Sequence, residues 1–535
     1  MLSILLTILI LLGVNFGNGI IIKRILKFEN QSFVLISFLG IVGITLLETL
    51  AAFFAPLNSF LEFLFILTGL AGVGWYWSRG NLSQINYQFS YWFYFFFLII
   101  IFSASFSPYL FDHYGYYVPT VSYLKQVGFV KGISNFDLLL GQTSFWHIYQ
   151  AGFSHFIDPF FKINSYLSVL FLIYIYERKQ YFLLIFIPIF LLFVQQPSPD
   201  LPVLIITLIV INELIHKKEN SILLYLSLFA VCIKPIVFWL PLLVIFQSAH
   251  QRKFNFKVVV PIFIFAGLSI AKNLWLFGFP LFPVSLIDFN LPWKPSQQMI
   301  TYSSQIGLMK SYDMKYTYQQ ISQFDFFDRI FHWFTIGYKS VFNIGIIVSL
   351  LIVGIFVFKK KSRFYYLLLI FLIVKSVVIF TISAQYRFFI DVYVIAIFIL
   401  VKYISEKKLL FFTVFLSLFV SVIFIFPRMI QKFNIGNRMS DFSWSQLYKP
   451  AQYNSVKISK NYTIGNLNFN SSKKIEHKDH FPSLNLYDLK LYDYYGIFPQ
   501  YLVKDYKSGF FQRKLTAAEK IQLKKIIAET QKLNP

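Results

Sequence analysis

Ionisable residues at the borders of long apolar runs are the side chains of this chain best placed to do chemistry. Asp112 follows one such run, Lys234 interrupts another immediately before a proline, and Arg387 immediately precedes a third. A carboxylate at a boundary between water and an apolar phase can accept a proton near neutral pH, because partial desolvation makes it more basic. Cations at such a depth are costly and rarely lack a function. The pattern therefore indicates acid–base chemistry at Asp112 and a functional role for the two cations.

Further candidates lie in the polar segments 107–164 and 278–340 and in the turn Gln195–Pro202. Asp200 could bind a metal or hydroxyl groups, a tryptophan face could stack on a ligand ring, and a histidine could bind an anion. Each residue type also has a structural alternative, since aspartates cap helices, lysines and arginines snorkel, and tryptophans favour membrane interfaces. The candidates for substrate or metal contact are Asp200, His113, Tyr116, Trp146, His147, Asp288 and Lys294.

The composition shows what kind of molecule must position these residues. Of the 535 residues, 57% are hydrophobic and only 13% are charged, whereas a soluble domain has about 25% charged residues. A soluble globular protein and a disordered chain are therefore excluded. The net charge of +24 does not indicate nucleic acid, because the basic residues form short clusters between apolar runs. The single cysteine, Cys232, excludes an intrachain disulfide and a cysteine metal cluster.

The apolar runs predict an all-α polytopic membrane protein with about 13–14 transmembrane or half-membrane helices. The runs are Leu2–Ile22, Phe33–Phe54, Leu57–Trp77, Tyr91–Phe106, Ser165–Tyr176, Tyr181–Val194, Leu201–Ile215, Ile222–Phe246, Val258–Phe277, Val341–Phe358, Phe364–Ile382, Phe388–Val401 and Leu409–Phe426.

Basic loops set the expected orientation. Clusters such as Lys359–Arg363 are expected in the cytoplasm. They share that side only if Ile222–Phe246 is a helical hairpin with Lys234-Pro235 at its tip, where proline breaks the helix. Both termini are then extracytoplasmic, and we expect the bacterial inner membrane. The chain divides into transmembrane helices at 1–106, 165–277 and 341–426, outer loops at 107–164 and 278–340, and an extracytoplasmic tail at 427–535.

The tail has a different composition, being polar and rich in lysine. Alternation at Val456/Ile458 and at Tyr462/Ile464 predicts short strands. Thr516 and Glu519 fit a capping box that begins a helix with Leu523 and Ile526 on one face. A small α+β region is therefore expected there.

Three groups of residues carry a resemblance to a known superfamily. Asp112, Tyr116 and Pro119 are followed by Gly128, Val130, Gly132 and Asn135, and then by Pro280–Pro283 and Trp293-Lys294 in the second outer loop. This order resembles the GT-C superfamily of membrane glycosyltransferases, which use polyprenyl-phosphate-linked sugars, and most closely a group of bacterial polytopic membrane proteins. Tyr117 stands where many relatives have histidine.

The resemblance implies a GT-C-like fold and a hexosyl- or pentosyltransferase activity. Asp112 would be the general base or would help to hold a divalent cation, and Lys234 and Arg387 would bind the phosphate. The implied partners are a polyprenyl-phosphate sugar donor, a glycan, glycolipid or protein acceptor, and the lipid bilayer, without nucleic acid.

Other functions remain open at this point. A transporter or flippase would be expected to have polar residues spread through mid-span positions and preferably an internal repeat, and the sequence indicates neither pattern. A polymerase or ligase of lipid-linked glycans would be expected to have an arginine-rich main loop, but Arg329 is the only arginine between Gly278 and Lys339. A non-catalytic assembly protein is a further alternative. No phosphate-binding glycine-rich loop is present.

Overall fold

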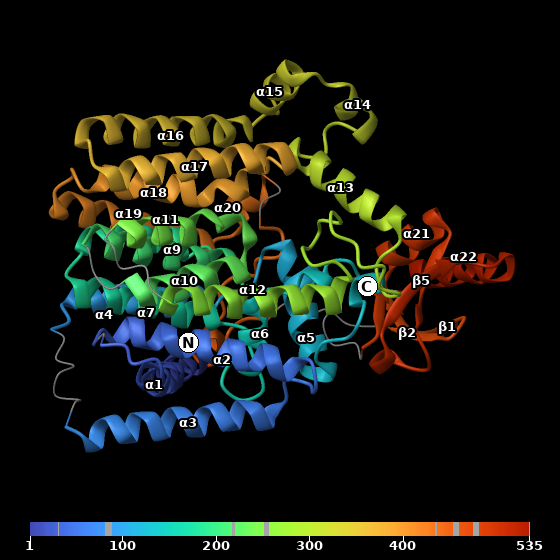
Figure 1. The fold of residues 1–535 in the computed structure, drawn as a ribbon, viewed down its shortest axis with the longest axis horizontal. Helices are drawn as coiled ribbons and strands as arrows, with labels where there is room; N and C mark the ends of the chain where they lie inside the picture. Colours follow the sequence, from blue (N-terminus) through green and yellow to red (C-terminus); the bar gives the residue numbers. More distant parts are fainter. Residues whose placement is uncertain are drawn as a thin grey trace.

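The structure, a computed structural model, describes residues 1–29, 31–80, 88–216, 220–250, 256–433, 436–452, 459–473 and 481–533. Most of it is a bundle of helices, and a small β-containing region lies at one end (Figure 1). Seven helices of the described residues are long and apolar enough to cross a membrane. They are α1 (Leu2–Ile25), α2 (Phe33–Ala52), α3 (Ser59–Ser78), α12 (Phe256–Phe277), α16 (Ser340–Lys360), α17 (Arg363–Ile382) and α19 (Glu406–Ile425).

Shorter helices fill the remaining apolar runs, so each predicted run coincides with helix in the structure. Helices α7 and α9 are buried along nearly their whole length and form the centre of the bundle. The shorter elements are α4 (Tyr91–Ala104), α7 (Ile163–Arg178), η5 (Tyr181–Phe186), α8 (Ile187–Phe190), α9 (Asp200–Ile215), α10 (Asn220–Ile233), α11 (Trp239–His250) and α18 (Ile390–Val401).

The break predicted at Lys234-Pro235 is present. Helix α10 ends at Ile233, a 3-10 turn η6 (Pro235–Val237) follows, and α11 begins at Trp239. The two helices pack against each other. Proline has no N–H to continue the helical hydrogen bonds, so Lys234 lies at the turn between two short helices.

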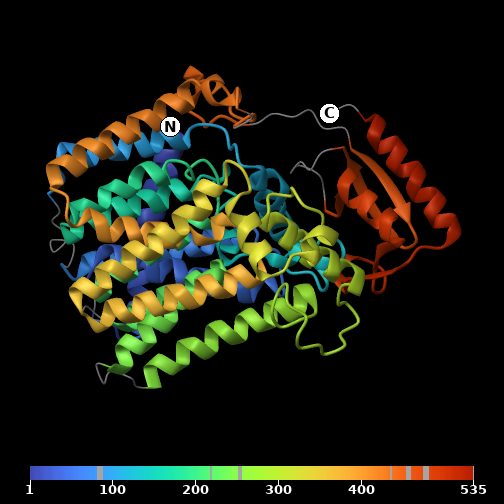
Figure 2. The ribbon, with the colours of Figure 1, turned by 90° about the horizontal axis from the view of Figure 1, so that it is seen from above.

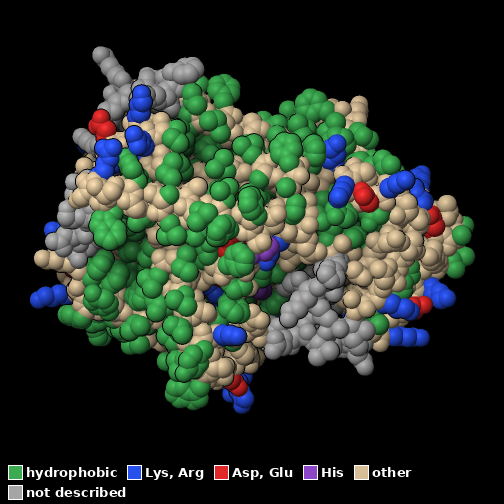
Figure 3. Space-filling model, turned by 90° about the horizontal axis from the view of Figure 1, so that it is seen from below, with side chains coloured by type: hydrophobic (Ala, Val, Ile, Leu, Met, Phe, Trp, Pro, Cys, Tyr) green, Lys and Arg blue, Asp and Glu red, His purple; other side chains and the backbone are tan. Residues whose placement is uncertain are grey.

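The outer surface of the bundle fits contact with lipid. Helices α16, α17 and α19 expose many large apolar side chains, including Phe342, Val377 and Phe415. In Figure 3 hydrophobic side chains cover most of the bundle face, while lysine and arginine gather toward its two ends. The chain is therefore a multi-pass membrane protein by the length and polarity of its helices.

The two ends of the bundle differ. The α16–α17 and α18–α19 loops, which carry Lys359–Arg363 and Lys402–Lys408, lie at the end opposite the β-containing region (Figure 1). The amine of Met1 donates to the carbonyl of Gln446, and the Ser3 amide donates to the Tyr448 carbonyl at 3.1 Å. The first residues therefore lie beside the segment that follows α19.

Short helices make up the segments between these elements. In α5 (Val118–Val127), Val118, Val121 and Leu124 share one helix face by their spacing, and all three are buried. The elements are η2 (His113–Tyr117), α5 (Val118–Val127), η3 (Ile133–Asn135), η4 (Leu140–Gln142), α6 (Phe145–Gly152), α13 (Gln297–Ser311), α14 (Tyr318–Gln323), α15 (Phe326–Phe334), η7 (Tyr386–Phe389), α20 (Arg428–Gln431) and η8 (Trp444–Leu447).

The C-terminal region is the small α+β unit that the sequence predicts. Strands β1, β2 and β3 form one sheet, in which β1 and β2 are antiparallel and β2 and β3 are parallel, while β4 and β5 form an antiparallel pair. In register, Tyr462 lies opposite Phe469. The other predicted alternation, at Val456 and Ile458, lies outside the residues that the structure describes. The elements are β1 (Lys460–Ile464), β2 (Leu467–Ser472), β3 (Ser483–Asn485), α21 (Leu486–Tyr495), β4 (Ile497–Tyr501), η9 (Tyr506–Ser508), β5 (Phe510–Lys514) and α22 (Ala517–Lys532).

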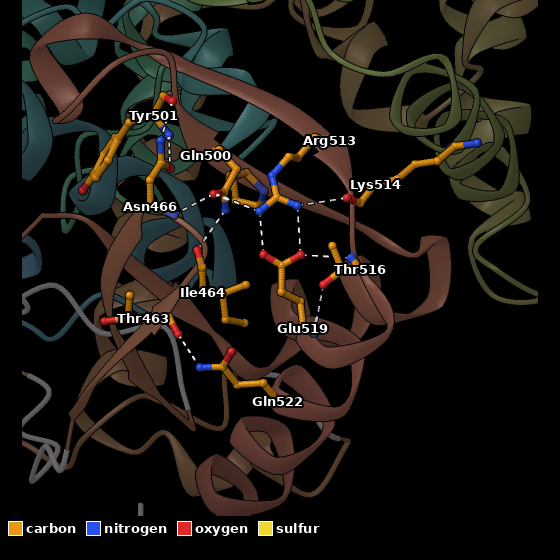
Figure 4. A network of polar contacts seen from close by, with 11 residues as sticks. Thr463, Ile464, Asn466, Gln500, Tyr501, Arg513, Lys514, Thr516, Glu519 and Gln522 are labelled. Carbon is orange, nitrogen blue, oxygen red and sulfur yellow. Dashed lines mark hydrogen bonds and ion pairs between the residues drawn. The ribbon is translucent and has the colours of Figure 1, made fainter.

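Polar contacts hold α22 to both sheets (Figure 4). The predicted capping box of Thr516 and Glu519 begins the helix, and Leu523 and Ile526 are buried. Arg513 of β5 donates to both oxygens of Glu519, at 2.5 and 2.8 Å, and this hydrogen-bonded cation lowers the pKa of Glu519 to about 2. Gln500 of β4 donates to the Ile464 carbonyl at 2.9 Å, which joins the two sheets.

Candidate functional site

An ion pair joins Asp112 and Arg387, which are far apart in the sequence. Asp112 directly precedes η2, and Arg387 lies in η7 between α17 and α18. Arg387 Nη1 donates to Asp112 Oδ2 at 2.9 Å, and each side chain is 41% exposed. Within the described part of the chain, Asp112 makes no capping hydrogen bond to the turn it precedes. Both groups can therefore meet a ligand.

A second ion pair joins Lys234 and Asp200. Asp200 is the first residue of α9, and Lys234 lies at the break between α10 and η6. Their side chains are mostly buried, at 15% and 16% exposed. The Lys234 ammonium also lies 5.4 Å from the ring centre of Phe388, the neighbour of Arg387. The break in the hairpin thus brings a cation toward the turn that carries Arg387.

Tyr117 lies close to both ion pairs. Its hydroxyl donates to Ser198 Oγ at 3.5 Å, and Ser198 Oγ donates to Asp200 Oδ2 at 3.3 Å. Burial raises the pKa of Tyr117 well above its usual value, and the nearby carboxylates of Asp200 and Asp112 raise it further. The Tyr117 hydroxyl therefore stays protonated. Because it lies near both Asp112 and Asp200, it links the two ion pairs into one site.

His147 and Tyr116 also lie at this site, where they pack against each other and beside Tyr117. The imidazole is completely buried and contacts the rings of Tyr116 and Tyr117 at 5.0 and 5.1 Å between centres. Burial lowers the pKa of His147 to about 3, so the ring is neutral and carries no charge for phosphate binding. Burial raises the pKa of Tyr116. His113 is buried against Tyr114.

Trp146 does not face a ligand. Its side chain is fully buried, and Nε1 donates to Asn164 Oδ1 at 2.8 Å. Asn164 in turn donates to the Ser198 carbonyl at 3.0 Å. The stacking role expected for Trp146 therefore does not fit this position, and the indole instead helps to fix the turn before Asp200.

A buried ion pair between helices supports the turn that carries Arg387. Lys375 of α17 pairs with Asp391 of α18 and also donates to the Phe388 carbonyl at 2.7 Å. Asp391 accepts a further hydrogen bond from Trp239 Nε1 at 2.8 Å. Both charges are almost fully buried, so the loss of either partner would leave an uncompensated charge. The sequence analysis did not identify this pair, because each residue lies alone inside an apolar run.

Asp288 and Lys294 pair with each other. Lys294 Nζ donates to Asp288 Oδ2 at 2.6 Å and to Asn290 Oδ1 at 2.8 Å. The hydrogen bond from Lys294 lowers the pKa of the exposed Asp288. Among the described residues, no ion pair or hydrogen bond of these two side chains reaches Asp112 or Arg387.

The glycine and asparagine motif of the first outer segment contacts the C-terminal unit. Asn135 donates to the carbonyls of Trp293 and Phe510 at 2.5 and 3.1 Å. Gly132 has a φ of +58°, and a Cβ there would lie 2.4 Å from the Phe510 oxygen. Lys131 lies over the rings of Trp275 and Trp293, at 4.6 and 5.4 Å. These residues join the two outer loops and β5, and they are not part of the charged site.

Two more cations lie near the site, and the sequence analysis missed both. Lys310 of α13 is close enough to Arg387 and Asp112 for both to affect its pKa, which is lowered by burial first and then by Arg387. The guanidinium of Arg438 lies 5.1 and 4.7 Å from the ring centres of Phe111 and Tyr114. Both cations lie in polar segments, where no apolar run marks them out.

The arrangement can hold an anion and accept a proton. Arg387 and Lys234 supply positive charge, and Asp112 and Asp200 supply two carboxylates. The described residues contain no group of three or more histidine, cysteine or acidic side chains that could hold a metal. A divalent cation at this site would therefore depend on Asp112, Asp200 and oxygens of the substrate.

Comparison with known proteins gives a family but no characterised relative. The family model described as a domain of unknown function (DUF8201) matches residues 1–394. This range includes Asp112, Asp200, Lys234 and Arg387 and ends within α18. No curated protein and no solved structure matches the chain.

Proposed function

The chain belongs to the DUF8201 family, and we propose that it is an integral membrane glycosyltransferase of GT-C type. It would transfer a hexosyl or pentosyl group from a polyprenyl-phosphate carrier to a glycan, glycolipid or protein acceptor. The reaction would take place on the outer side of the bacterial inner membrane. The chain would have about 13–14 transmembrane or half-membrane segments and extracytoplasmic termini.

The observation that carries this proposal is the meeting of Asp112, Arg387, Asp200 and Lys234. Four segments supply them, and all four lie at helix ends or breaks. A lipid-linked donor and a water-borne acceptor can meet at such a position, with the phosphate near the cations. The GT-C resemblance assigns the acid role to Asp112 and phosphate binding to Lys234 and Arg387, and the proposal adopts these roles.

The ion pairs suggest how binding and reaction are coupled. Arg387 is bound to Asp112, and a neighbouring cation makes a carboxylate a weaker base. A donor phosphate that binds Arg387 would release Asp112. The freed carboxylate would then take the proton of the acceptor hydroxyl while that oxygen attacks the anomeric carbon. The bond from the sugar to the phosphate oxygen breaks, and Arg387 and Lys234 stabilise the leaving polyprenyl phosphate.

The test compares wild type with Asp112→Asn and with Asp313→Asn as a matched control. Asp313 is also ion-paired, with Lys339 of the second outer loop, but it is not one of the four site charges. Purified full-length protein receives radiolabelled polyprenyl-phosphate sugars and a membrane glycolipid extract, with and without EDTA. We expect Asp112→Asn to lower label transfer by about 10²–10⁴-fold and Asp313→Asn to leave it near the wild-type level.

Equal transfer by wild type and Asp112→Asn would reject the role of Asp112. Loss of wild-type transfer with EDTA would favour a metal-holding role over that of a simple base. If wild type transferred no label from any donor while remaining folded, the glycosyltransferase proposal would give way to the transporter and assembly functions.

A further inference from the structure

The charges of the site already neutralise one another. Asp112 pairs with Arg387, and Asp200 pairs with Lys234. A phosphate that binds either cation must therefore displace a carboxylate. An additional cation without an acidic partner would bind the phosphate without that competition, because its attraction is not already compensated.

Lys310 is such a cation in the described part of the chain. None of the contacts described for its side chain is an ion pair or a side-chain hydrogen bond, and the side chain is only partly buried. Nearby in the same loop region, Lys339 is instead paired with Asp313.

The fold brings the end of α13, which carries Lys310, against the chain segment that leads to Arg387. Helix α13 ends at Ser311, and its last turn contacts the chain just before η7. Ser383 Oγ donates to the Gly307 carbonyl at 2.7 Å, and the Ala384 amide donates to Ser311 Oγ at 2.9 Å. Lys310 lies between these two contact points in the sequence, and the electrostatic effect of Arg387 and Asp112 on it agrees with this position.

We propose that Lys310 binds the phosphate of the lipid-linked substrate. This inference rests on the proposed function and adds a third phosphate-binding residue to Lys234 and Arg387. The two ion pairs leave the positive charge of Lys310 uncompensated, and the phosphate of the donor carries the opposite charge. Lysine suits this role as a compact, mobile cation that can follow the phosphate as its charge increases.

The experiment measures binding of polyprenyl phosphate to the full-length protein in detergent by native mass spectrometry. Wild type is compared with Lys310→Met and with Arg329→Met, which removes an exposed cation from α15 in the same outer segment. Polyprenol of the same chain length is the uncharged probe, and inorganic phosphate is added as a competitor. We expect Lys310→Met to weaken polyprenyl phosphate binding about tenfold, as for loss of one charge-assisted contact. Arg329→Met and polyprenol binding should be unchanged.

Three outcomes would overturn the inference: wild-type affinity in Lys310→Met, an equal loss in Arg329→Met, or no binding of polyprenyl phosphate by wild type. Competition by inorganic phosphate at similar concentration would show that the site recognises phosphate without its lipid. Binding that depends on Lys310, without any sugar transfer, would support the inference and reject the glycosyltransferase. Sugar transfer by Lys310→Met with an unchanged KM for the donor would reject phosphate binding by Lys310 and leave the proposed glycosyltransferase function in place.

Discussion

At the scale of single residues, the charged side chains of the site differ in how available they are to a ligand. Asp112 and Arg387 are each 41% exposed, whereas Lys234 and Asp200 are about 15% exposed. A surface pair of this kind contributes little to stability, so Asp112 and Arg387 can separate at low cost. The more buried pair is better suited to hold α9 and the hairpin in place.

A substitution of Trp146 can show whether its side chain contacts the sugar or only holds neighbouring residues in position. We expect Trp146→Phe to lower the stability of the protein by about 1–2 kcal/mol, because Asn164 would lose a buried hydrogen-bond donor. The KM for a sugar donor should change less than twofold, since the indole does not reach the site. Thermal unfolding and donor titration measure the two effects. A large rise in KM without a loss of stability would instead favour sugar stacking.

At the scale of elements, the site depends on places where helices stop. Asp112 lies before η2, Asp200 begins α9, Lys234 lies in the hairpin break and Arg387 lies in η7. Backbone polar groups at helix ends need partners other than the helix itself, and polar side chains collect there. The buried pair of Lys375 and Asp391 holds the η7 turn in place, because Lys375 also donates to the Phe388 carbonyl in that turn.

The contact between the first outer segment and β5 gives a prediction for Gly132. We expect Gly132→Ala to weaken docking of the C-terminal unit by about 1–3 kcal/mol, because its backbone is left-handed and the Phe510 carbonyl occupies the Cβ position. Limited proteolysis should then release a fragment that contains β1–β5.

Gly307→Ala is the matched control for this measurement. Gly307 lies in α13, and a Cβ there would meet no atom within 4 Å, so proteolysis should match wild type. Wild-type resistance in Gly132→Ala would show that this contact does not hold the C-terminal unit.

At the scale of the whole molecule, the helices that expose apolar side chains, such as α16, α17 and α19, lie between two polar ends. One end carries basic loops, and the other carries the C-terminal unit (Figure 2 shows the same separation from above). The positive-inside rule predicts that the basic loops lie in the cytoplasm, and in that orientation the charged site would face outward.

Cysteine labelling tests this orientation. Cys232 is the only cysteine, so Cys232→Ser provides a background without thiols. In that background we expect Ser508→Cys of the C-terminal unit to react with a membrane-impermeant maleimide in intact spheroplasts. Ser362→Cys, between α16 and α17, should react only after the membrane is permeabilised. The reverse pattern would place the site in the cytoplasm and contradict the use of an outward-facing lipid-linked donor.

The sequence by itself determined the features that depend on local composition. Apolar runs fixed the places of the helices, since lipid requires backbone groups to pair within each segment. Proline fixed the break after Lys234, and the Thr516 and Glu519 spacing fixed the start of α22. The selection of Asp112, Asp200, Lys234 and Arg387 as candidates also came from the sequence, because each lies beside or within an apolar run and outside the basic clusters.

Only the tertiary structure decided which of these residues meet. Asp112 and Arg387 are separated by 275 positions, and no local pattern states which distant charge a carboxylate will contact. The sequence could not show that Trp146 is buried and hydrogen-bonded to Asn164. For the same reason it could not show that Asp288 pairs with Lys294, or that Lys310 lies near Arg387. Each outcome depends on how helices and loops pack, and packing joins residues that the sequence keeps apart.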